Sequence, residues 1–320
     1  FICRLKKDGK CIIIVKKGAY RVKSQVKGNI MLFICALVWG IAFVAQSEGM
    51  KHVGAFTFLS VRSFIGAAVL IPVIFIFSKA NKNKEVKEPE NKKMLLLGGS
   101  ACGAALCAAS AFQQFGIAID ASAGDAGFIT ALYILIVPII KLLFGSKIGI
   151  KTWIGVALAL FGFYLLTEKF GGFTLGCLLV LISAFLFAVH ILVVDYFAGK
   201  ADGVRLSCLQ FFVCAVISGV LMLIFEKPSF ADIWAAKSSI IYAGAMSSGV
   251  GYTLQVLGQK YTKPTAASMI MSLESVFALI AGMILQPEAN PVKLIKITGC
   301  VLIFAAIILA QLPEKELKNA

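Results

Sequence analysis

The sequence has few charged residues and almost no histidine. Only 15% of its 320 residues are Asp, Glu, Lys or Arg, and only two are His. Soluble domains carry about 25% charged residues and roughly 45–50% apolar residues, whereas 59% of this chain is apolar. The mean hydropathy is +0.91. These values exclude an ordinary soluble domain.

Sequence motifs of catalysis and of metal binding are also missing. The sequence contains no GxxxxGK[ST] loop for ATP, no HExxH zinc motif and no GxSxG nucleophile motif. Its nine cysteines are scattered and none forms a CxxC pair, which argues against a zinc site and against a disulfide framework. We therefore expect no enzyme, no bound metal and no cofactor.

Apolar runs of about twenty residues recur along the chain. A helix of that length crosses a hydrocarbon core of about 30 Å, and lipid offers no hydrogen bonds, so each run must satisfy its own backbone as a helix. The sequence thus predicts an all-α polytopic membrane protein with ten transmembrane helices. Its predicted spans are 28–46, 54–77, 94–118, 122–144, 152–167, 173–195, 205–225, 236–258, 265–286 and 297–311.

The basic residues fix an orientation for these spans. Ten spans put both termini on one side, and that side holds 24 of the 31 Lys and Arg residues against six on the other. By the positive-inside rule this side is cytoplasmic. We expect a multi-pass protein of the cell (plasma or inner) membrane. The net charge of +15 follows from this topology and indicates the lipid bilayer, rather than nucleic acid, as a partner.

The second half of the chain repeats the first. Gln113-x-x-Gly116 matches Gln255-x-x-Gly258, 142 positions later, and a period near 140 indicates a duplicated half-protein. The halves are 28–167 with helices 1–5 and 168–311 with helices 6–10, flanked by a basic N-terminal tail, 1–27, and a cytoplasmic C-terminal tail, 312–320. The N-terminal tail is either a juxtamembrane segment on anionic lipid or an upstream extension from start-site choice.

Five spans per half make the repeat inverted, because an odd number of spans inserts the second copy upside down. Inverted repeats around a polar midplane site are typical of alternating-access transporters. Small residues allow helices to approach closely, so we expect the third and eighth spans to form the central contact. The residues concerned are Gly98, Gly99, Gly103, Gly244, Gly249 and Gly251.

Two charged residues, Arg62 and Glu274, lie deep inside predicted spans, where a charge costs roughly 2.5–3.5 kcal/mol. Glu274 is interpreted either as a cavity group, which pairs a substrate cation or carries a proton, or as a neutral carboxyl group bonded between helices. Arg62 either binds a substrate carboxylate or locks helices together.

Polar and aromatic residues add further candidates. Gln113 and Gln255 are equivalent, and Gln255 shares one helix face with Ser248, Tyr252 and Gln259, as a pore wall or an interhelical hydrogen-bonding face would. Trp39, Phe128 and Tyr133 are candidate aromatic walls of a cavity, although aromatic residues in spans are more often packing residues or interface belts, and His190 is interpreted as a satisfied core histidine. The full set of substrate-cavity candidates is Trp39, Arg62, Gln113, Phe128, Tyr133, His190, Tyr252, Gln255 and Glu274.

Several short segments resemble the drug/metabolite transporter superfamily, EamA-type. They are Leu37–Phe43 (LVWGIAF), Arg62, the Gly-Phe-Ile after Ala126, and Leu273–Ala278 (LESVFA). The resemblance implies a ten-helix inverted repeat whose central cavity is lined mainly by the third, fourth, eighth and ninth helices and their first- and sixth-helix neighbours. It also implies export or exchange of small metabolites such as amino acids. Trp39, Arg62, Gln113, Gln255 and Glu274 match the polar and aromatic pattern of that family.

One departure from the family concerns the end of the fourth span. Many relatives carry an acidic residue there, and this chain has Gly145-Ser146-Lys147, so no role is carried over to that loop.

We expect a secondary active transporter of a small-molecule substrate, with proton coupling left open. A passive channel and a non-transporting membrane scaffold remain alternatives: uncoupled flux without saturation would favour the channel, and no flux the scaffold. The sequence gives no information on the oligomeric state.

Overall fold

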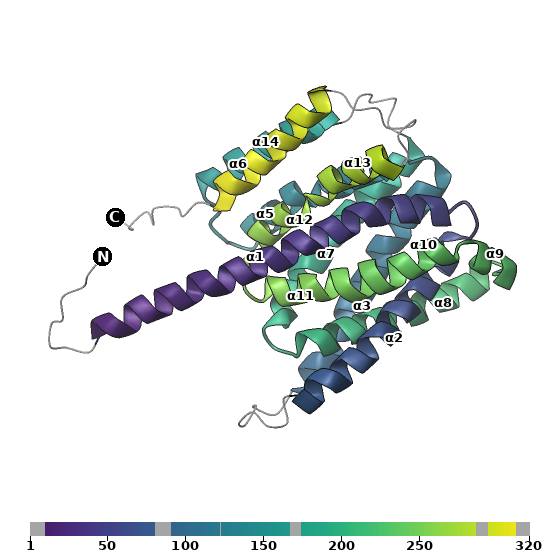
Figure 1. The fold of residues 1–320 in the computed structure, drawn as a ribbon, viewed down its shortest axis with the longest axis horizontal. Coiled ribbons are helices and arrows are strands. Elements are labelled where there is room, and N and C mark those ends of the chain that lie inside the picture. The colour runs from purple at the N-terminus through teal and green to yellow at the C-terminus, as the bar shows by residue number, and fades with distance from the viewer. Residues whose placement is uncertain (1–9, 81–90, 122, 167–173, 286–293, 312–320) are drawn as a thin grey trace.

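The computed structural model describes residues 10–80, 91–121, 123–166, 174–285 and 294–311. Every element in these ranges is a helix (Figure 1). The first nine residues and the predicted C-terminal tail, 312–320, lie outside the described part. In the first half the helices are α1 (Lys10–Gly49), α2 (Ala55–Ala80), α3 (Lys92–Ile119), α4 (Ala123–Thr130), α5 (Tyr133–Leu143) and α6 (Ile150–Leu166).

The second half contains a similar series with more interruptions. It consists of α7 (Leu175–Ala198), α8 (Gly203–Phe225), α9 (Phe230–Ala235), α10 (Lys237–Ile241), the π-helix η1 (Tyr242–Tyr252), α11 (Thr253–Gln259), α12 (Pro264–Met271), α13 (Glu274–Leu285) and α14 (Leu294–Gln311). Helix α1 begins at Lys10 and so includes much of the predicted basic tail.

Seven helical segments in the described residues are long and apolar enough to cross a membrane, not ten. Two shorter apolar helices lie at Ile150–Gly162 and Ile297–Leu309. The predicted span 236–258 is not a single α-helix, because it is divided among α10, η1 and α11. Gly244, Gly249 and Gly251 lie in this π-helical stretch, and glycine is a poor α-helix former.

The predicted spans 122–144 and 265–286 are each broken near the middle. At the breaks the amides of Leu132 and Leu273 bond the carbonyl three residues earlier, at 3.1 and 3.2 Å, instead of four. In the second copy the Ser272 hydroxyl donates to a main-chain carbonyl at 2.7 Å. Tyr133 and Glu274 are the first residues after the two breaks. The breaks therefore fall at equivalent places in both halves.

The two halves exchange their first helices. Helix α1 packs against η1, α11, α12 and α13 of the second half, and α7 packs against α3, α4 and α5 of the first half. The equivalent helices α2 and α8 pack together, as do α6 and α14, which lie side by side at the top of Figure 1. These reciprocal contacts fit two copies of one unit related by an approximate two-fold axis.

Two equivalent glycine pairs bring backbones into close contact. A Cβ atom added to Gly258 would lie 3.0 Å from the carbonyl oxygen of Gly28, and one added to Gly116 would lie 2.7 Å from that of Gly176. A shift of 148 residues takes Gly28 onto Gly176, and the sequence repeat takes Gly116 onto Gly258. The same contact therefore occurs once between α1 and α11 and once between α7 and α3.

The predicted central contact between the third and eighth spans is wrong. Gly103 of α3 lies against Val213 of α8, and Gly244 of η1 lies against Ile65 of α2. These small faces are covered by the first and second helices of the opposite half, since Gly98 also lies against Phe197 of α7 and Gly251 lies against Trp39 of α1. They permit close approach as expected, but to different partners.

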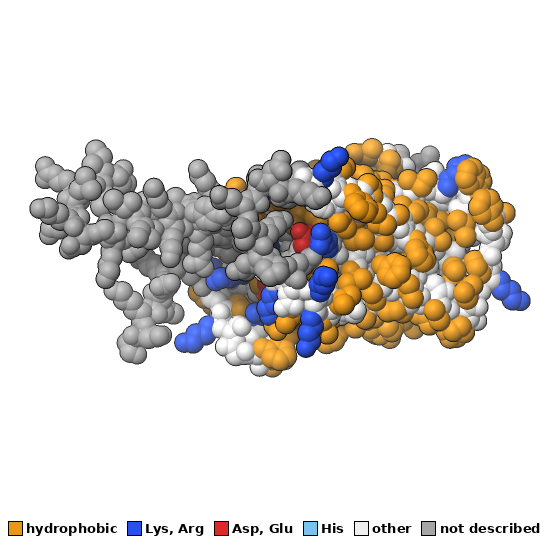
Figure 2. Space-filling model, turned by 90° about the horizontal axis from the view of Figure 1, so that it is seen from below, with side chains coloured by type: hydrophobic (Ala, Val, Ile, Leu, Met, Phe, Trp, Pro, Cys, Tyr) orange, Lys and Arg blue, Asp and Glu red, His pale blue; other side chains and the backbone are white. Residues whose placement is uncertain are grey.

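The outer surface is apolar. Phe75, Leu223 and Phe225 are among many large exposed apolar side chains. On the face in Figure 2, a broad stretch of orange side chains without Lys or Arg separates two groups of basic side chains. Such a surface suits lipid around the middle of the bundle and headgroups or water at its ends. The protein is a multi-pass membrane protein.

Candidate functional site: a cavity between the two repeats

A cavity lies where the first helices and the broken helices of the two halves meet. The space between its lining atoms is about 340 Å³, including the part that opens to the surroundings. Its lining residues are Trp39, Ala42, Phe43, Gln46, Arg62, Gln113, Thr130, Tyr133, Phe187, Ser247, Tyr252 and Glu274.

One basic and one acidic side chain line this cavity. Arg62 and Glu274 are each 3% exposed. No ion pair within 4.0 Å joins them, since Lys51–Glu48 at the surface is the ion pair found in the described residues. Arg62 Nη1 donates to Gln46 Oε1 at 3.2 Å, and neither Arg62 Nε nor Glu274 Oε1 has a described hydrogen-bond partner. Both groups are thus able to interact with a ligand.

Glu274 faces its structural counterpart from the other half. Tyr133 begins α5 after the break in the first copy, just as Glu274 begins α13 after the break in the second. The Tyr133 hydroxyl lies close to the Glu274 carboxyl group, and it has no hydrogen-bond partner that meets the usual geometry among the described residues. The two helix breaks therefore bring a phenol and a carboxyl group to the same cavity wall.

Side-chain amides form a second wall. Gln46 Oε1 accepts from Arg62 and also from Gln114 Nε2. Gln113 Nε2 donates to Thr130 Oγ1 at 2.9 Å. Gln113 thus combines both alternatives that the sequence left open, because it bonds between helices and also lines the cavity.

Aromatic rings close the third side. The Trp39 and Tyr252 rings are 4.5 Å apart between centroids, and Phe211 packs on Tyr252 at 5.4 Å. A Cβ atom on Gly251 would lie 2.8 Å from Trp39 Nε1, so this glycine makes room for the indole. Trp39 Nε1 has no described hydrogen-bond acceptor, and the ring can offer that donor to a ligand.

Six of the nine predicted cavity residues line the cavity. They are Trp39, Arg62, Gln113, Tyr133, Tyr252 and Glu274.

The other three predicted residues lie outside this lining. Phe128 is partly buried and packs against the apolar core. His190 is fully buried, with its Nε2 3.2 Å from Gln210 Oε1. Gln255 is buried one turn beyond Tyr252, and its Oε1 has no described partner.

The site prediction missed six lining residues, which are Ala42, Phe43, Gln46, Thr130, Phe187 and Ser247. Gln46 follows Trp39 by seven residues, which places both on one face of a helix, so this signal was present in the sequence. Phe187 corresponds to Trp39 under the 148-residue shift between halves. Thr130 and Ser247 carry no comparable signal, because they depend on the helix break and on the π-helix.

Metal ligands do not gather at this site. Within the described ranges, no three His, Cys, Asp or Glu side chains are grouped as a metal site would need. The cavity instead combines a cation, a carboxyl group, amides and aromatic rings. These groups can form hydrogen bonds, charge pairs and apolar contacts.

A duplicated helical unit with a polar cavity between its copies defines a class of membrane transport proteins. A family model confirms that class: the EamA-like transporter family matches residues 26–168 and again 174–312. The chain belongs to this family. The predicted resemblance and the predicted duplication are thereby confirmed.

Similar proteins match this chain over most of its length and over most of their own. An uncharacterized transporter of Archaeoglobus fulgidus is 28% identical over 313 residues, covering 97% of this chain and 93% of its own length. The uncharacterized transporter YoaV of Bacillus subtilis is 23% identical and covers 88% of this chain and 96% of its own length. One crystal structure matches with a TM-score of 0.67 at 18% identity, covering 89% of this chain and 96% of that one. This last likeness supports the fold alone.

Proposed function

We propose that the protein is a secondary active transporter that carries small zwitterionic metabolites, such as amino acids, by alternating access. The observation that carries the proposal is the cavity itself, because it contains Arg62 and Glu274 without an ion pair between them. Arginine matches the geometry of a carboxylate, and a carboxylate attracts an ammonium group. A zwitterion satisfies both groups at once.

The walls of the cavity favour the same ligands. The Trp39 and Tyr252 rings, 4.5 Å apart, offer an apolar surface with polar edges. A buried charge without a partner is costly, so a ligand that pairs with Arg62 and Glu274 gains affinity from groups that are otherwise unsatisfied.

Glu274 is also our candidate for proton coupling. A carboxyl group inside a membrane protein is typical of proton relays, and the Tyr133 hydroxyl beside it can donate to the ionised form. Binding of a proton and binding of an ammonium group would then compete at Glu274. That competition couples the movement of the proton to export of the substrate.

The proposed topology has ten membrane crossings as a 5+5 inverted repeat. The seven long apolar helices would be joined by the two shorter ones in α6 and α14 and by the interrupted segment α10–η1–α11. With both termini in the cytoplasm of the cell membrane, the basic residues follow the positive-inside rule. Alternating access then exchanges the conformations of two similar halves.

Uptake into proteoliposomes tests the function. Purified protein would be reconstituted and screened against pooled amino acids and other metabolites, with and without a pH gradient. Saturable uptake that the gradient drives supports a proton-coupled carrier. Flux that rises linearly with concentration and ignores the gradient would identify a channel, and the absence of flux from every pool would leave a scaffold.

Two matched variants test in the same assay whether Glu274 is responsible for proton coupling. Glu274→Gln should abolish the response to the pH gradient, and Glu48→Gln should not, because Glu48 pairs with Lys51 at the surface. Equal effects of the two substitutions would remove Glu274 from the proposal while leaving the transport function intact.

A further inference from the structure

A second cluster of buried polar side chains lies beyond the cavity. His190 of α7 and Gln210 of α8 are both fully buried, with His190 Nε2 3.2 Å from Gln210 Oε1. Gln255 and Gln259 of α11 are 1% and 3% exposed. Gln259 Nε2 donates to the main-chain carbonyl of Ile191 at 2.9 Å. Three helices of the second half thus contribute polar groups to one region.

Most members of this cluster are only half satisfied. Among the described residues, no partner is found for His190 Nδ1, Gln210 Nε2, Gln255 Oε1 or Gln259 Oε1. Burying a polar atom without a hydrogen bond costs free energy, and apolar residues would pack the same space without that cost. These residue types therefore need an explanation other than packing.

The internal repeat relates this cluster to the cavity wall. The shift of 148 residues that takes the start of α2, Ala55, onto the start of α8, Gly203, also takes Arg62 onto Gln210. The sequence repeat takes Gln113 onto Gln255. The cavity is lined by Arg62 and Gln113 from the first half, and the second half places its own counterparts in the buried cluster.

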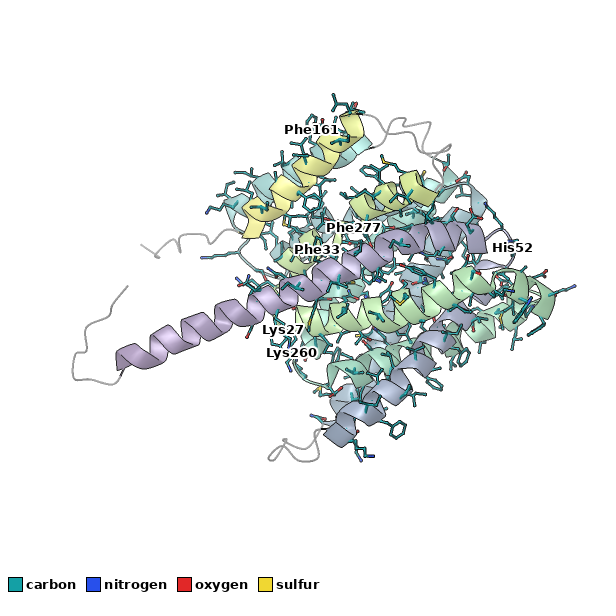
Figure 3. The ribbon with its side chains drawn as sticks, in the orientation of Figure 1. Lys27, Phe33, His52, Phe161, Lys260 and Phe277 are labelled. Carbon is teal, nitrogen blue, oxygen red and sulfur yellow. The ribbon has the colours of Figure 1, made fainter. Side chains whose placement is uncertain are left out.

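The cluster leads from the cavity to one end of the bundle. Its cavity end is at Tyr252, whose ring lies 6.0 Å from the His190 ring. Its other end is Gln259, next to Lys260. Figure 3 shows Lys260 beside Lys27 at one end of the bundle and His52 at the opposite end. The proximity agrees with Lys27 Nζ lying 6.0 Å from the ring of Tyr261.

We infer that His190, Gln210, Gln255 and Gln259 form a second set of substrate contacts, which lines the path between the cavity and the Lys27–Lys260 end and is closed in this structure. The inference rests on the proposed function. In an inverted repeat, the opposite-facing state gives each half the conformation of the other. Separation of α11 from α7 and α8 would then expose the cluster, and its unpartnered atoms would bind the polar groups of a passing zwitterion.

The first test replaces a polar member by an apolar one of similar size. Gln210→Leu removes an unpartnered amide nitrogen together with the 3.2 Å contact of Gln210 Oε1 with His190 Nε2, so a packing role predicts a lower melting temperature and an unchanged flux per folded molecule. The inference predicts the same stability result together with a fall in flux of about tenfold, the effect of losing one good hydrogen bond on the path. Ser218→Ala, on the same helix, serves as the control and should keep its flux. Wild-type flux in Gln210→Leu would overturn the inference.

The second test uses the two histidines of the chain, and its labelling readout needs no substrate. His52 is exposed and His190 is fully buried. Proteoliposomes would be treated with diethyl pyrocarbonate, and modification of each histidine would be followed by mass spectrometry. The inference predicts that His190 is modified in the folded protein and that flux falls in step, whereas the lower flux of a His190→Gln variant does not fall further on treatment.

The outcomes separate this inference from the proposed function. If His52 is fully modified while His190 stays intact and saturable flux continues, the second contact set is refuted and the transporter stands. If the wild-type protein shows no saturable flux from any pool, the proposed function fails. Modification of His190 only under denaturing conditions would likewise overturn the inference.

Discussion

Adding one methyl group at each of the two glycine contacts between the halves should destabilise the protein to a similar extent. In Gly116→Ala the new Cβ would lie 2.7 Å from the carbonyl oxygen of Gly176, and in Gly258→Ala it would lie 3.0 Å from that of Gly28. Ordinary contacts of a Cβ atom are 3.4–4 Å. A main-chain oxygen cannot rotate away as a side chain can, so a helix must move.

The expected cost follows from overpacking. Extra methyl groups in a well-packed core cost typically about 1–3 kcal/mol, and at roughly 2 °C for each kcal/mol in a chain of this size the melting temperature should fall by about 2–6 °C. Gly199→Ala is the matched control, because nothing lies within 4 Å of its Cβ and its backbone is in the right-handed helical region. That variant should be neutral or slightly stabilised.

Fluorescence-detected thermal unfolding of the three variants in detergent measures these shifts. If Gly116→Ala and Gly258→Ala have the same melting temperature as the Gly199→Ala control, the close backbone approach is refuted. If only one of them is destabilised, the two contacts are not equivalent, and the two-fold relation between the halves is wrong at this point.

Three further predictions concern single side chains. Glu226→Gln should destabilise the protein by about 1–2 kcal/mol, since its carboxylate accepts three hydrogen bonds from Phe56 and Thr57 at the start of α2; a melting temperature equal to wild type would contradict this. Tyr133→Phe should keep the melting temperature but weaken gradient-driven uptake, and unchanged uptake would exclude the hydroxyl from coupling. Trp39→Phe should raise KM for zwitterions by about tenfold through loss of a hydrogen bond and of ring contact; an unchanged KM in the uptake assay would exclude the indole from binding.

The class of the protein and its duplication could be predicted from the sequence, because both depend on averages over many residues. Lipid demands long apolar runs, and the Gln113 and Gln255 motifs preserve the repeat. Arg62 and Glu274 could also be recognised from the sequence, because a charge within a membrane span is rare and needs a protein cavity or partner.

The helix breaks and the partners of each helix could not be predicted from residue patterns. Periodicity describes a helix as continuous, whereas the breaks before Tyr133 and Glu274 arise from a few main-chain hydrogen bonds that change from four-residue to three-residue spacing. The glycine faces of the third and eighth spans predicted close approach but not to which helix. Composition carries no information on which helix packs against each glycine face, because this depends on the exchange of α1 and α7 between the halves.

Substrate analogues offer the most direct test of the cavity as a zwitterion site. Wild type, Arg62→Gln and Glu274→Gln would be assayed for inhibition of uptake by an amino acid, its methyl ester and its decarboxylated amine. Each charged hydrogen bond is worth about 1.5–3 kcal/mol, so Arg62→Gln should weaken the amino acid by roughly tenfold or more. It should leave the ester and the amine unchanged, because neither has the carboxylate that Arg62 binds. Equal weakening of all three compounds would contradict the assignment and reduce Arg62 to a helix lock.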